Sequence, residues 1–580
     1  MKSLKELKKN LKKKETSKLP PVKVAILGDV ATQFLTIAIQ GWLVENGFRA
    51  EIFEAPFNQV ENQCLNPMSE LHSFSAQFII FIQSTHKLNE KYSLSDITSY
   101  NHLANERIAF ISKVCQIFKK STIICCNYPE IDDSVFGSYS NKVSSSFLYQ
   151  TRKLNLALMD LSQSVDNLMI CDLSSIQNKY GRDLIFDPSI YASTEMNVSV
   201  DFVPVIAKSM VDIILSIKGK EKKCVILDLD NTLWGGVIGD DGVSGIELGH
   251  GLGIGKMFTE FQEWLLKLKN RGIILCVCSK NSEEVAKQPF LNHPDMVLRL
   301  KDIAVFIANW ESKVTNIRTI QKILNIGFDS MIFLDDNPCE RGVVKENIPE
   351  VVVPDLPKDP SQYLEYLYSL NLFETSSYSV TDLNRTKQYK EKAEREIFQS
   401  SFDNEDDFLK SLNMKSVVSS FDDFNIPRIA QLTQRSNQFN LRTIRYTEAD
   451  INRISSSQFY ITRYFTLSDR FGDNGLICVV ILKKQDEQSL FIETWLMSCR
   501  VLNRGMESFV LNNLIKVAKD NGFKKIIGEY LPTQKNALVK GLYSKLGFEK
   551  IPNCTTDLYQ ISTDNYTDRN CFIERIDNNG

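Results

Sequence analysis

The sequence lacks the features that mark membrane, secreted and nucleic-acid-binding proteins. It has no run of about 18 apolar residues, so no membrane-spanning helix is predicted. Its first residues contain no apolar segment of the kind found in secretory signals. The net charge is only −3, which does not favour nucleic acid as a partner. The 13 cysteines include no CxxC pair, and several lie in apolar, strand-like runs, so we expect buried thiols in a cytoplasmic protein.

The length and composition are those of a globular protein with several domains. A chain of 580 residues has room for three or four domains. Hydrophobic residues make up 43% of the chain and charged residues 24%, as in ordinary soluble proteins. Residues 1–20 form a lysine-rich arm, which we expect to be a solvated, frayed helix.

Strand-like and helix-like segments alternate over residues 21–219, which predicts an open α/β domain. Gly28 and Asp29, at the end of the first apolar run, resemble the opening of an SGNH-hydrolase fold. An esterase of that kind needs a histidine to activate its nucleophile, and none occurs between His102 and His250. We therefore expect a flavodoxin- or SGNH-like domain that binds or docks. The predicted strands are Val24–Asp29, Phe78–Gln83, Thr122–Asn127 and Leu168–Leu173.

The central region, residues 220–375, is organised around the segment CVILDLDNT at residues 224–232. Its four apolar residues lead directly into Asp228 and Asp230. Such a run is typical of a strand buried on both faces of a parallel sheet, whose carboxyl end borders a ligand crevice. Because side chains alternate along a strand, both carboxylates start on the same side. Adjacent carboxylates are tolerated when a cation lies between them or when one holds a proton.

Two further strands of this region are predicted to end in polar residues. One runs from Gly272 and reaches Ser279, and another runs from Ser330 to Asp335 and Asp336. Lys313 lies near the start of the helical segment between them. Acids, a hydroxyl and an ammonium at neighbouring strand ends are the groups that phosphoryl transfer through an aspartyl phosphate needs. The acids also offer the oxygen ligands that Mg²⁺ prefers.

These segments resemble the four motifs of the haloacid dehalogenase (HAD) superfamily, in its FkbH-like branch of subfamily IIIC. The resemblance is carried by DLDNTLWGGVIGDDG, VCSKN, the stretch from Trp310 to the lysine, and FLDDNP. It implies that Asp228 is the nucleophile. It also implies that Asp230 is the general acid/base and that its backbone carbonyl binds Mg²⁺. Only about 25 residues separate Thr232 from the next predicted helix at Phe258, too few for a large cap domain.

The same resemblance assigns the remaining site residues. Ser279 and Lys313 would hold the phosphoryl group. Asp335 and Asp336 would complete the metal site, with Asp336 favoured as the direct ligand. We expect the segment Trp234–Gly242 to be a tight hairpin that serves as the local lid.

The region 376–580 begins with charged connector helices and continues with mixed strands and helices that resemble the GNAT acyltransferase fold. Residues 465–482 predict a hairpin and residues 489–501 a long strand. The resemblance implies a coenzyme A or phosphopantetheine loop at Arg500, Asn503 and Gly505, although glycine is usual in place of Asn503. Asparagine tolerates left-handed dihedral angles, so the loop can persist. Tyr543 matches the general acid of some acyltransferases, with a core tyrosine as the alternative.

The expected fold is therefore a three-domain α/β chain whose central HAD domain has a Rossmann-like parallel sheet. FkbH-like proteins load a glyceryl group from a phosphorylated glycerate onto an acyl carrier protein, and the segment Gln431–Leu441 also resembles them. This implies a phosphorylated small molecule as substrate, an acyl carrier protein or acyl-CoA as partner, and Cys278 as the candidate acyl acceptor. A buried strand cysteine is the alternative for Cys278. Two other functions stay open: a simple HAD phosphatase acting on a small metabolite, and a non-enzymatic docking platform for carrier proteins.

Overall fold

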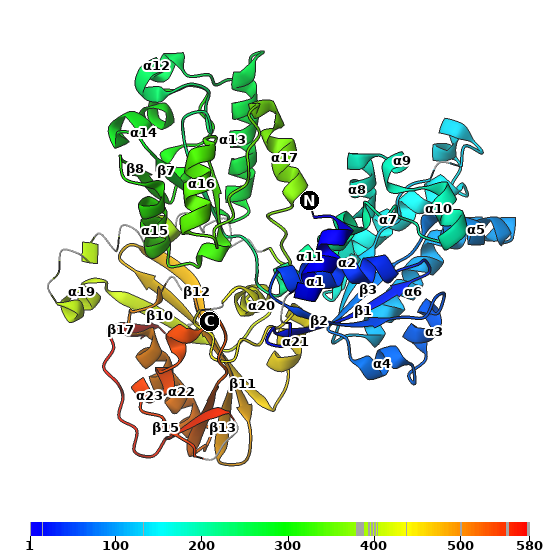
Figure 1. The fold of residues 1–580 in the computed structure, drawn as a ribbon. Coiled ribbons are helices and arrows are strands. Elements are labelled where there is room, and N and C mark those ends of the chain that lie inside the picture. The colour runs from blue at the N-terminus through cyan, green and yellow to red at the C-terminus, as the bar shows by residue number, and fades with distance from the viewer. Residues whose placement is uncertain are drawn as a thin grey trace. The chain divides into compact units, whose positions relative to one another are not determined.

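The computed structural model describes residues 2–13, 16–131, 133–378, 388–391, 395, 398–399, 402, 404–436, 438–498, 501–552 and 556–576. These residues form two compact units, Met1–Ser216 and Ile217–Gly580, and each unit is described by itself (Figure 1). Within the described ranges, no helix combines the length and the apolar character needed to cross a bilayer.

The first unit begins with helix α1 (Leu4–Lys13), which packs against helix α2 (Gln33–Glu45). The side chain of Leu7 is fully buried, and a Cβ atom on Gly41 would lie 2.7 Å from it. The expectation of a solvated, frayed arm is therefore wrong for this stretch. The reason is that leucines recur at helical spacing, so one face of α1 is apolar while its lysines lie on the other.

The sheet of the first unit has five parallel strands in the order β2-β1-β3-β4-β5. Four of them confirm the apolar runs seen in the sequence. β2 was not predicted, since all six of its residues are only half-buried and its apolar run is short. The chain leaves β1 for β2 and then returns to the other side of β1 at β3, so β1 and β3 flank a topological switch point. The strands are β1 (Pro21–Gly28), β2 (Arg49–Glu54), β3 (Phe78–Ile82), β4 (Thr122–Cys126) and β5 (Leu168–Cys171).

Helices cover both faces of this sheet, as an open α/β domain requires (Figure 1). The further helices of the unit are α3 (Val60–Leu65), α4 (Glu70–Phe74), α5 (Thr85–Leu94), α6 (Leu103–Ile117), α7 (Phe147–Ser164), α8 (Leu173–Tyr180), α9 (Arg182–Ile185), α10 (Pro188–Thr194) and α11 (Val203–Ile217), with short 3₁₀ helices η1 (Ile97–His102) and η2 (Gly137–Lys142).

The second unit opens with a four-stranded parallel sheet in the order β8-β7-β6-β9, which confirms the predicted Rossmann-like sheet. One apolar cluster covers each of its faces; Leu227 belongs to one cluster and Ile226 to the other, as the alternation along β6 dictates. The strands are β6 (Cys224–Leu227), β7 (Ile274–Ser279), β8 (Val305–Ala308) and β9 (Met331–Leu334); the helices are α12 (Ile238–Gly245), α13 (Ile254–Asn270), α14 (Glu283–Asn292), α15 (Lys313–Leu324), α16 (Pro338–Asn347) and α17 (Tyr363–Leu370).

The lid differs from the predicted hairpin. The chain after Asp230 makes only isolated bridges, between Asp230 and Trp234 and between Gly235 and Glu247, and then forms the short helix α12. Asp241 stabilises the start of this helix, because its carboxylate reaches back and accepts a hydrogen bond of 2.7 Å from the backbone N–H of Val237, the residue before α12. Residues 233–253 contain no other helix, in agreement with the expected lack of a large cap.

The rest of the second unit is built on a mixed eight-stranded sheet in the order β15-β16-β14-β13-β12-β11-β10-β17. β11 and β12 pair antiparallel, which confirms the predicted hairpin. The strands are β10 (Met414–Ser419), β11 (Tyr460–Asp469), β12 (Gly472–Lys484), β13 (Ser489–Met497), β14 (Lys525–Tyr530), β15 (Glu549–Lys550), β16 (Asp557–Ser562) and β17 (Ile573–Ile576); the helices are α19 (Glu405–Ser411), α20 (Ile426–Arg435), α21 (Glu448–Ser455), α22 (Met506–Asp520) and α23 (Leu542–Lys545).

β13 and β14 pair only over their first residues, and a segment of the same chain fills the space between their far ends. The pairing covers Ser489–Ile492. Further along, the backbone of β13 bonds to Phe439 and Leu441, and Leu531 just after β14 donates to the Leu441 carbonyl at 2.9 Å. The end of the FkbH-like segment Gln431–Leu441 thus lies between β13 and the end of β14 and is hydrogen-bonded to both sides.

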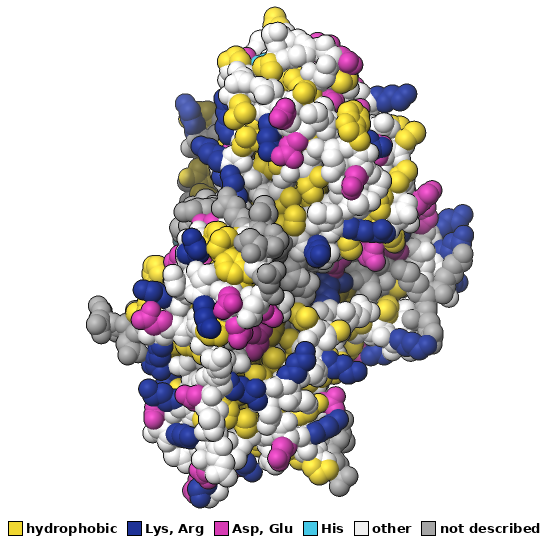
Figure 2. Space-filling model, turned by 90° about the vertical axis from the view of Figure 1, so that its left-hand side faces the viewer, with side chains coloured by type: hydrophobic (Ala, Val, Ile, Leu, Met, Phe, Trp, Pro, Cys, Tyr) yellow, Lys and Arg dark blue, Asp and Glu magenta, His cyan; other side chains and the backbone are white. Residues whose placement is uncertain are grey.

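On the face of the molecule drawn in Figure 2, basic and acidic side chains both occur, with apolar side chains scattered between them.

Candidate active site

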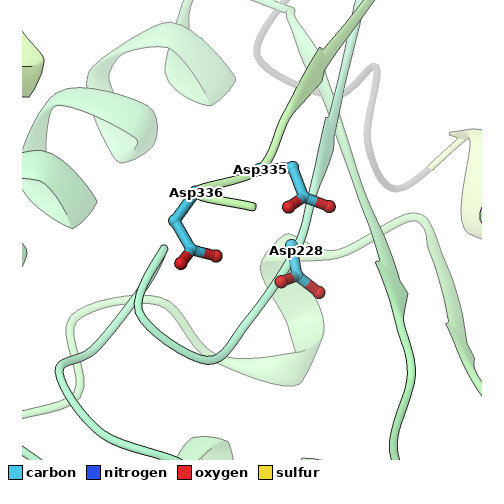
Figure 3. Close-up of side chains that lie close together, drawn as sticks. All are labelled: Asp228, Asp335 and Asp336. Carbon is cyan, nitrogen blue, oxygen red and sulfur yellow. The ribbon is translucent and has the colours of Figure 1, made fainter. Parts of the chain in front are cut away.

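Two acidic strand ends lie side by side at the switch point of the four-stranded sheet. β6 and β9 are neighbours, and the backbone N–H of Asp228 donates a hydrogen bond of 3.0 Å to the Leu334 carbonyl. Asp335 and Asp336 follow directly after β9. The carboxylates of Asp228, Asp335 and Asp336 converge on one space, as Figure 3 shows. This is the edge at which open α/β sheets bind their ligands.

Helix caps place the other charged groups. Ser312 caps α15 by accepting a hydrogen bond of 3.1 Å from Thr315 N–H, which puts Lys313 in the first turn. Asn337 caps α16 in the same way, so the chain turns immediately after the acidic pair. The backbone N–H of Asn309 donates to the Ser279 carbonyl at 3.2 Å. The end of β7 and the loop that leads to Lys313 are therefore held together.

Lys313 lies between two of the carboxylates. Its Nζ atom is 2.9 Å from Asp228 Oδ1 and also contacts Asp335 Oδ2, and its side chain is only 4% exposed. Burial alone would lower the pKa of this ammonium, but the two carboxylates outweigh it and raise the pKa of Lys313 above its ordinary value. Lys313 is therefore a fixed positive charge beside the predicted nucleophile.

One ammonium does not neutralise three carboxylates. One oxygen from each of Asp228, Asp335 and Asp336 lies within 4.8 Å of the others. Burial, followed by the charge of Asp228, raises the pKa of Asp335 to about 6 and also raises the pKa of Asp336. Both oxygens of Asp335 are engaged, by Lys313 and by the N–H of Asn337 at 2.8 Å. A compact set of carboxylate oxygens with excess negative charge fits a hard divalent cation. Of the two acids that follow β9, Asp336 is the one whose carboxylate is available to bind such a cation.

Asp230 is held by groups that the sequence did not reveal. Its Oδ1 atom accepts hydrogen bonds of 3.0 Å from the indole Nε1 of Trp234 and from the N–H of Ile238. Its Oδ2 atom accepts one of 3.1 Å from Asn281 Nδ2. Asp230 does not belong to the three-carboxylate group, and burial raises its pKa. Asn281 lies two residues after Ser279 in the VCSKN motif, and this closeness is the signal that could have found it.

Further polar contacts fix the loops around the acids. Thr232 Oγ1 accepts a hydrogen bond of 3.1 Å from Asp336 N–H. Arg341 is 7% exposed and donates to the carbonyls of both residues of the acidic pair, at 2.8 and 2.6 Å. Asn231 adopts a left-handed conformation with φ of 54°, and its side chain accepts a hydrogen bond from Gly236 N–H at 3.0 Å. These contacts hold the strand ends rigid, which positioning for phosphoryl transfer requires.

The predicted thiol lies beside the site but is enclosed. Cys278 is fully buried, and its Sγ atom is 3.8 Å from the Lys313 carbonyl. Burial raises the pKa of this thiol to about 12. A thiolate is the reactive form of cysteine, so this environment favours the buried strand cysteine over the acyl acceptor. Ser279 ends β7 and is 2% exposed, at the strand position expected for the phosphoryl-binding hydroxyl.

The predicted coenzyme A loop is described only in part. Arg500 lies outside the described residues. Asn503 and Gly505 both have left-handed backbones, with φ of 60° and 76°, which confirms that asparagine is accommodated there; Gly505 directly precedes α22. Tyr543 is 1% exposed and packs over Gly528, where a Cβ atom would lie 2.5 Å from its hydroxyl, and burial raises its pKa. These surroundings favour a core tyrosine. The coenzyme A-binding role of Asn503 and Gly505 and the general-acid role of Tyr543 stay predictions.

Comparison with known proteins gives a family match to the first unit and a solved structure similar to about two thirds of the chain. The model of the FkbH N-terminal domain matches residues 23–215. The crystal structure of the N-terminal part of BF1531 from Bacteroides fragilis, which contains a phosphatase domain and is complexed with Mg, shares 55% sequence identity and a TM-score of 0.64. That match covers 65% of this chain and 100% of the other. No curated protein matches the chain.

Acetyltransferases of the GNAT fold also match part of the chain. The ribosomal-protein-S18-alanine N-acetyltransferase of Escherichia coli is 15% identical, with a TM-score of 0.20, over 26% of this chain and 99% of the other. An aminoglycoside acetyltransferase in complex with coenzyme A is 16% identical, with a TM-score of 0.20, over 26% of this chain and 95% of the other. Such scores support no inference about activity.

The parallel sheet, the acidic strand ends and the buried lysine between them define a HAD-type phosphatase domain without a large cap. Together with the match to the Bacteroides protein and to the FkbH N-terminal domain, they show the family: the chain belongs to the FkbH-like proteins of the HAD superfamily.

Proposed function

We propose that this protein is a Mg²⁺-dependent phosphatase or phosphotransferase that works through an aspartyl phosphate on Asp228. A carboxylate oxygen of Asp228 attacks phosphorus, the bond from phosphorus to the leaving oxygen breaks, and Asp230 gives its proton to that oxygen. Asp230 then takes a proton from the water or alcohol that attacks the phosphoenzyme, and the Asp228 carboxylate is regenerated. The observation that carries this proposal is the contact between Asp228 and the Lys313 ammonium at 2.9 Å.

The residues present fit the implied metal. Asp228, Asp336 and the backbone carbonyl of Asp230 would hold Mg²⁺, with Asp335 beside them. Bound there, the ion supplies positive charge against the phosphoryl oxygens. Lys313 supplies further positive charge, and Ser279 offers a hydroxyl to the same phosphoryl group. The raised pKa of Asp230 suits a group that must hold a proton before it can donate one.

The test is phosphate release from p-nitrophenyl phosphate and a panel of sugar and hydroxy-acid phosphates, with Mg²⁺ and with a chelator. We expect Asp228→Asn to abolish release while far-UV circular dichroism stays unchanged. We expect Asp230→Asn to slow breakdown of the phosphoenzyme, so that intact-protein mass spectrometry detects one added phosphoryl group. Release that persists in folded Asp228→Asn would refute the aspartyl-phosphate route.

The finer proposal concerns the substrate. We propose that the site acts on a phosphorylated glycerate-type compound in the cytoplasm and that its dephosphorylation is coupled to acyl transfer onto an acyl carrier protein. Support comes from the family and from the small lid, whose only helix is the short α12, so that a large partner has access to the site. Trp310 belongs to the loop between β8 and Lys313 and is 77% exposed, so an indole is available at the rim for a substrate or carrier.

Mass spectrometry of candidate carrier proteins after incubation with 1,3-bisphosphoglycerate separates this proposal from the alternative. A glyceryl adduct on the carrier, dependent on Asp228, would support coupled transfer. Phosphate release from a small metabolite without any adduct would favour the simple HAD phosphatase, with the flanking domains serving for binding and specificity.

A further inference from the structure

A second candidate site lies in the first unit and shares no residue with the phosphatase site. A cavity of about 240 Å³ opens where three neighbouring strands of the five-stranded sheet end. Asp29 follows β1, Gln83 and Ser84 follow β3, and Tyr128 follows β4; all four line the cavity. β1 and β3 flank the topological switch point, so the cavity occupies the crevice in which open α/β sheets bind ligands.

The floor of the cavity is a fixed guanidinium. Arg107 reaches the cavity from α6, and its side chain is 11% exposed. Its Nε atom donates a hydrogen bond of 3.0 Å to the Tyr128 hydroxyl, and Nη2 donates to Gln83 Oε1. The Tyr128 hydroxyl, on a side chain 1% exposed, donates to the same Gln83 oxygen at 3.0 Å. The Nη1 atom lies 3.8 Å from Glu61 Oε1, which also lines the cavity. A guanidinium has five donors, so Arg107 keeps further N–H groups for an oxygen in the cavity.

An acceptor stands beside these donors. Asp29 Oδ1 accepts a hydrogen bond of 2.8 Å from the backbone N–H of Ser84, and this bond fixes the carboxylate at the end of β1. Burial raises the pKa of Asp29. In the described part of the chain, no hydrogen bond to its second oxygen is found, and Asp29 lines the cavity. The floor of the cavity can thus donate hydrogen bonds to a ligand and accept hydrogen bonds from it, and a hydroxyl group of a ligand can take part in both.

The wall is aromatic. The rings of Tyr92 and Tyr100 stack with their centroids 4.0 Å apart, and both residues line the cavity together with Phe110. A flat ring surface beside paired donors and acceptors suits a compact molecule that has both apolar faces and hydroxyl groups. The charged lining residues are three acids and two bases, so neither an anion nor a cation is strongly favoured: Asp29, Glu61, Glu106, Lys91 and Arg107.

We propose that this cavity binds a neutral, polyhydroxylated small molecule of about the size of a monosaccharide. Arg107 and Asp29 would bond to its hydroxyls, and the tyrosine pair would contact its apolar face. The volume lies just under the range usual for drug-sized ligands, which favours a small metabolite. No histidine lines the cavity, so the proposal concerns binding and includes no hydrolytic step. It does not depend on the phosphatase activity of the second unit.

The test uses the full chain and saturation-transfer NMR, followed by calorimetry. The probes are D-glucose, D-galactose, D-mannose and glycerol, with D-glucuronate and D-glucosamine as charged counterparts. We expect at least one neutral probe to bind, and D-glucuronate and D-glucosamine to bind roughly tenfold more weakly than the best neutral probe. Tyr100→Ala and Asp29→Asn should each weaken the neutral probe about tenfold, because each removes one contact of the kind described.

Tyr139→Ala is the matched control, because Tyr139 is 62% exposed and does not line the cavity; it should leave binding unchanged. Circular dichroism shows whether each variant folds, and phosphate release by the second unit should be the same in all of them. The proposal is overturned if no neutral probe binds, if a charged counterpart binds more tightly, or if folded Tyr100→Ala and Asp29→Asn both bind as the unchanged chain does.

Discussion

The indole Nε1 of Trp234 donates a hydrogen bond of 3.0 Å to Asp230 Oδ1, so the lid is tied directly to the predicted general acid/base. The N–H of Ile238, the first residue of α12, bonds to the same oxygen. The position of the lid and the orientation of the acid are therefore set together. Substrate contacts that move α12 would act on Asp230 through these two bonds.

Trp234→Phe should lower kcat for phosphate release about tenfold and leave KM nearly unchanged. Phenylalanine keeps a ring against Phe290, whose centroid lies 6.0 Å from that of Trp234, but it cannot donate to Asp230. Loss of a positioning partner commonly costs 10–100-fold in activity. Trp264→Phe is the control in the same domain, since Trp264 packs on Phe261 without contacting the acid. Equal kinetics for both variants would contradict the link between lid and acid.

Lys313→Met should reduce phosphate release by about 10²–10³-fold, the usual effect of losing one donor to the transition state. It should also destabilise the fold, because Asp228 and Asp335 would remain as buried carboxylates without their ammonium. The double variant Lys313→Met/Asp335→Asn removes part of that repulsion. Urea denaturation should therefore show partial recovery of stability, while activity stays low. Full activity in the single variant would refute the role of Lys313.

The acidic strand ends were predictable because apolar runs lead into polar residues without a break. Strands of a parallel sheet end at one edge, so Asp228, Ser279 and Asp336 had to lie close together. The partners of Asp230 were not predictable, because they depend on how the lid folds back. The glycines and acids of the lid suit a turn and a helix start equally well, and the hydrogen bond from Val237 N–H to Asp241 that supports the helix start cannot be read from the sequence. Strand β2 was not predictable either, because all six of its residues are half-buried and its sequence shows no clear alternation of buried and exposed positions.

Cys278→Ala should leave phosphate release unchanged, since the thiol is buried and its pKa is raised to about 12. Iodoacetamide at pH 7.5 should label the exposed Cys339 and spare Cys278, as peptide mass spectrometry would show. Labelling of Cys278 in the folded chain, together with loss of carrier acylation in Cys278→Ala, would instead restore it as the acyl acceptor.

Asp469→Asn should lower the free energy of unfolding of the C-terminal region by about 3–5 kcal/mol. The Asp469 side chain is fully buried and lies 2.8 Å from Arg395 and 3.0 Å from Arg504, whose side chains are 4% and 6% exposed. Neutralising it removes the negative charge that both buried guanidinium groups contact. Asp473→Asn, at an exposed position of the same hairpin, is the control and should change the urea midpoint little. Similar midpoints for the two variants would contradict a dominant role for this ion pair.

The stability of the first unit should fall as the pH decreases from about 6.5 to about 4. Burial, and then the charge of Arg182, lowers the pKa of His86 from 6.5 to about 4, and its ring stacks on Phe186 with centroids 4.1 Å apart. The unfolded chain then binds a proton that the folded chain does not, so the stabilisation is complete above pH 6.5 and is lost toward pH 4.

Because His86 is only half-buried, solvent screening limits the effect to about 1–2 kcal/mol. Hydrogen–deuterium exchange of peptides from α5 and α10 at several pH values measures it within the full chain. His86→Phe keeps an aromatic ring but cannot take up a proton, so protection should vary less between pH 6.5 and pH 4. His102→Phe, at an exposed histidine of the same unit, should retain the pH dependence of the unchanged chain. If His86→Phe also retains it, other groups must cause the acid sensitivity.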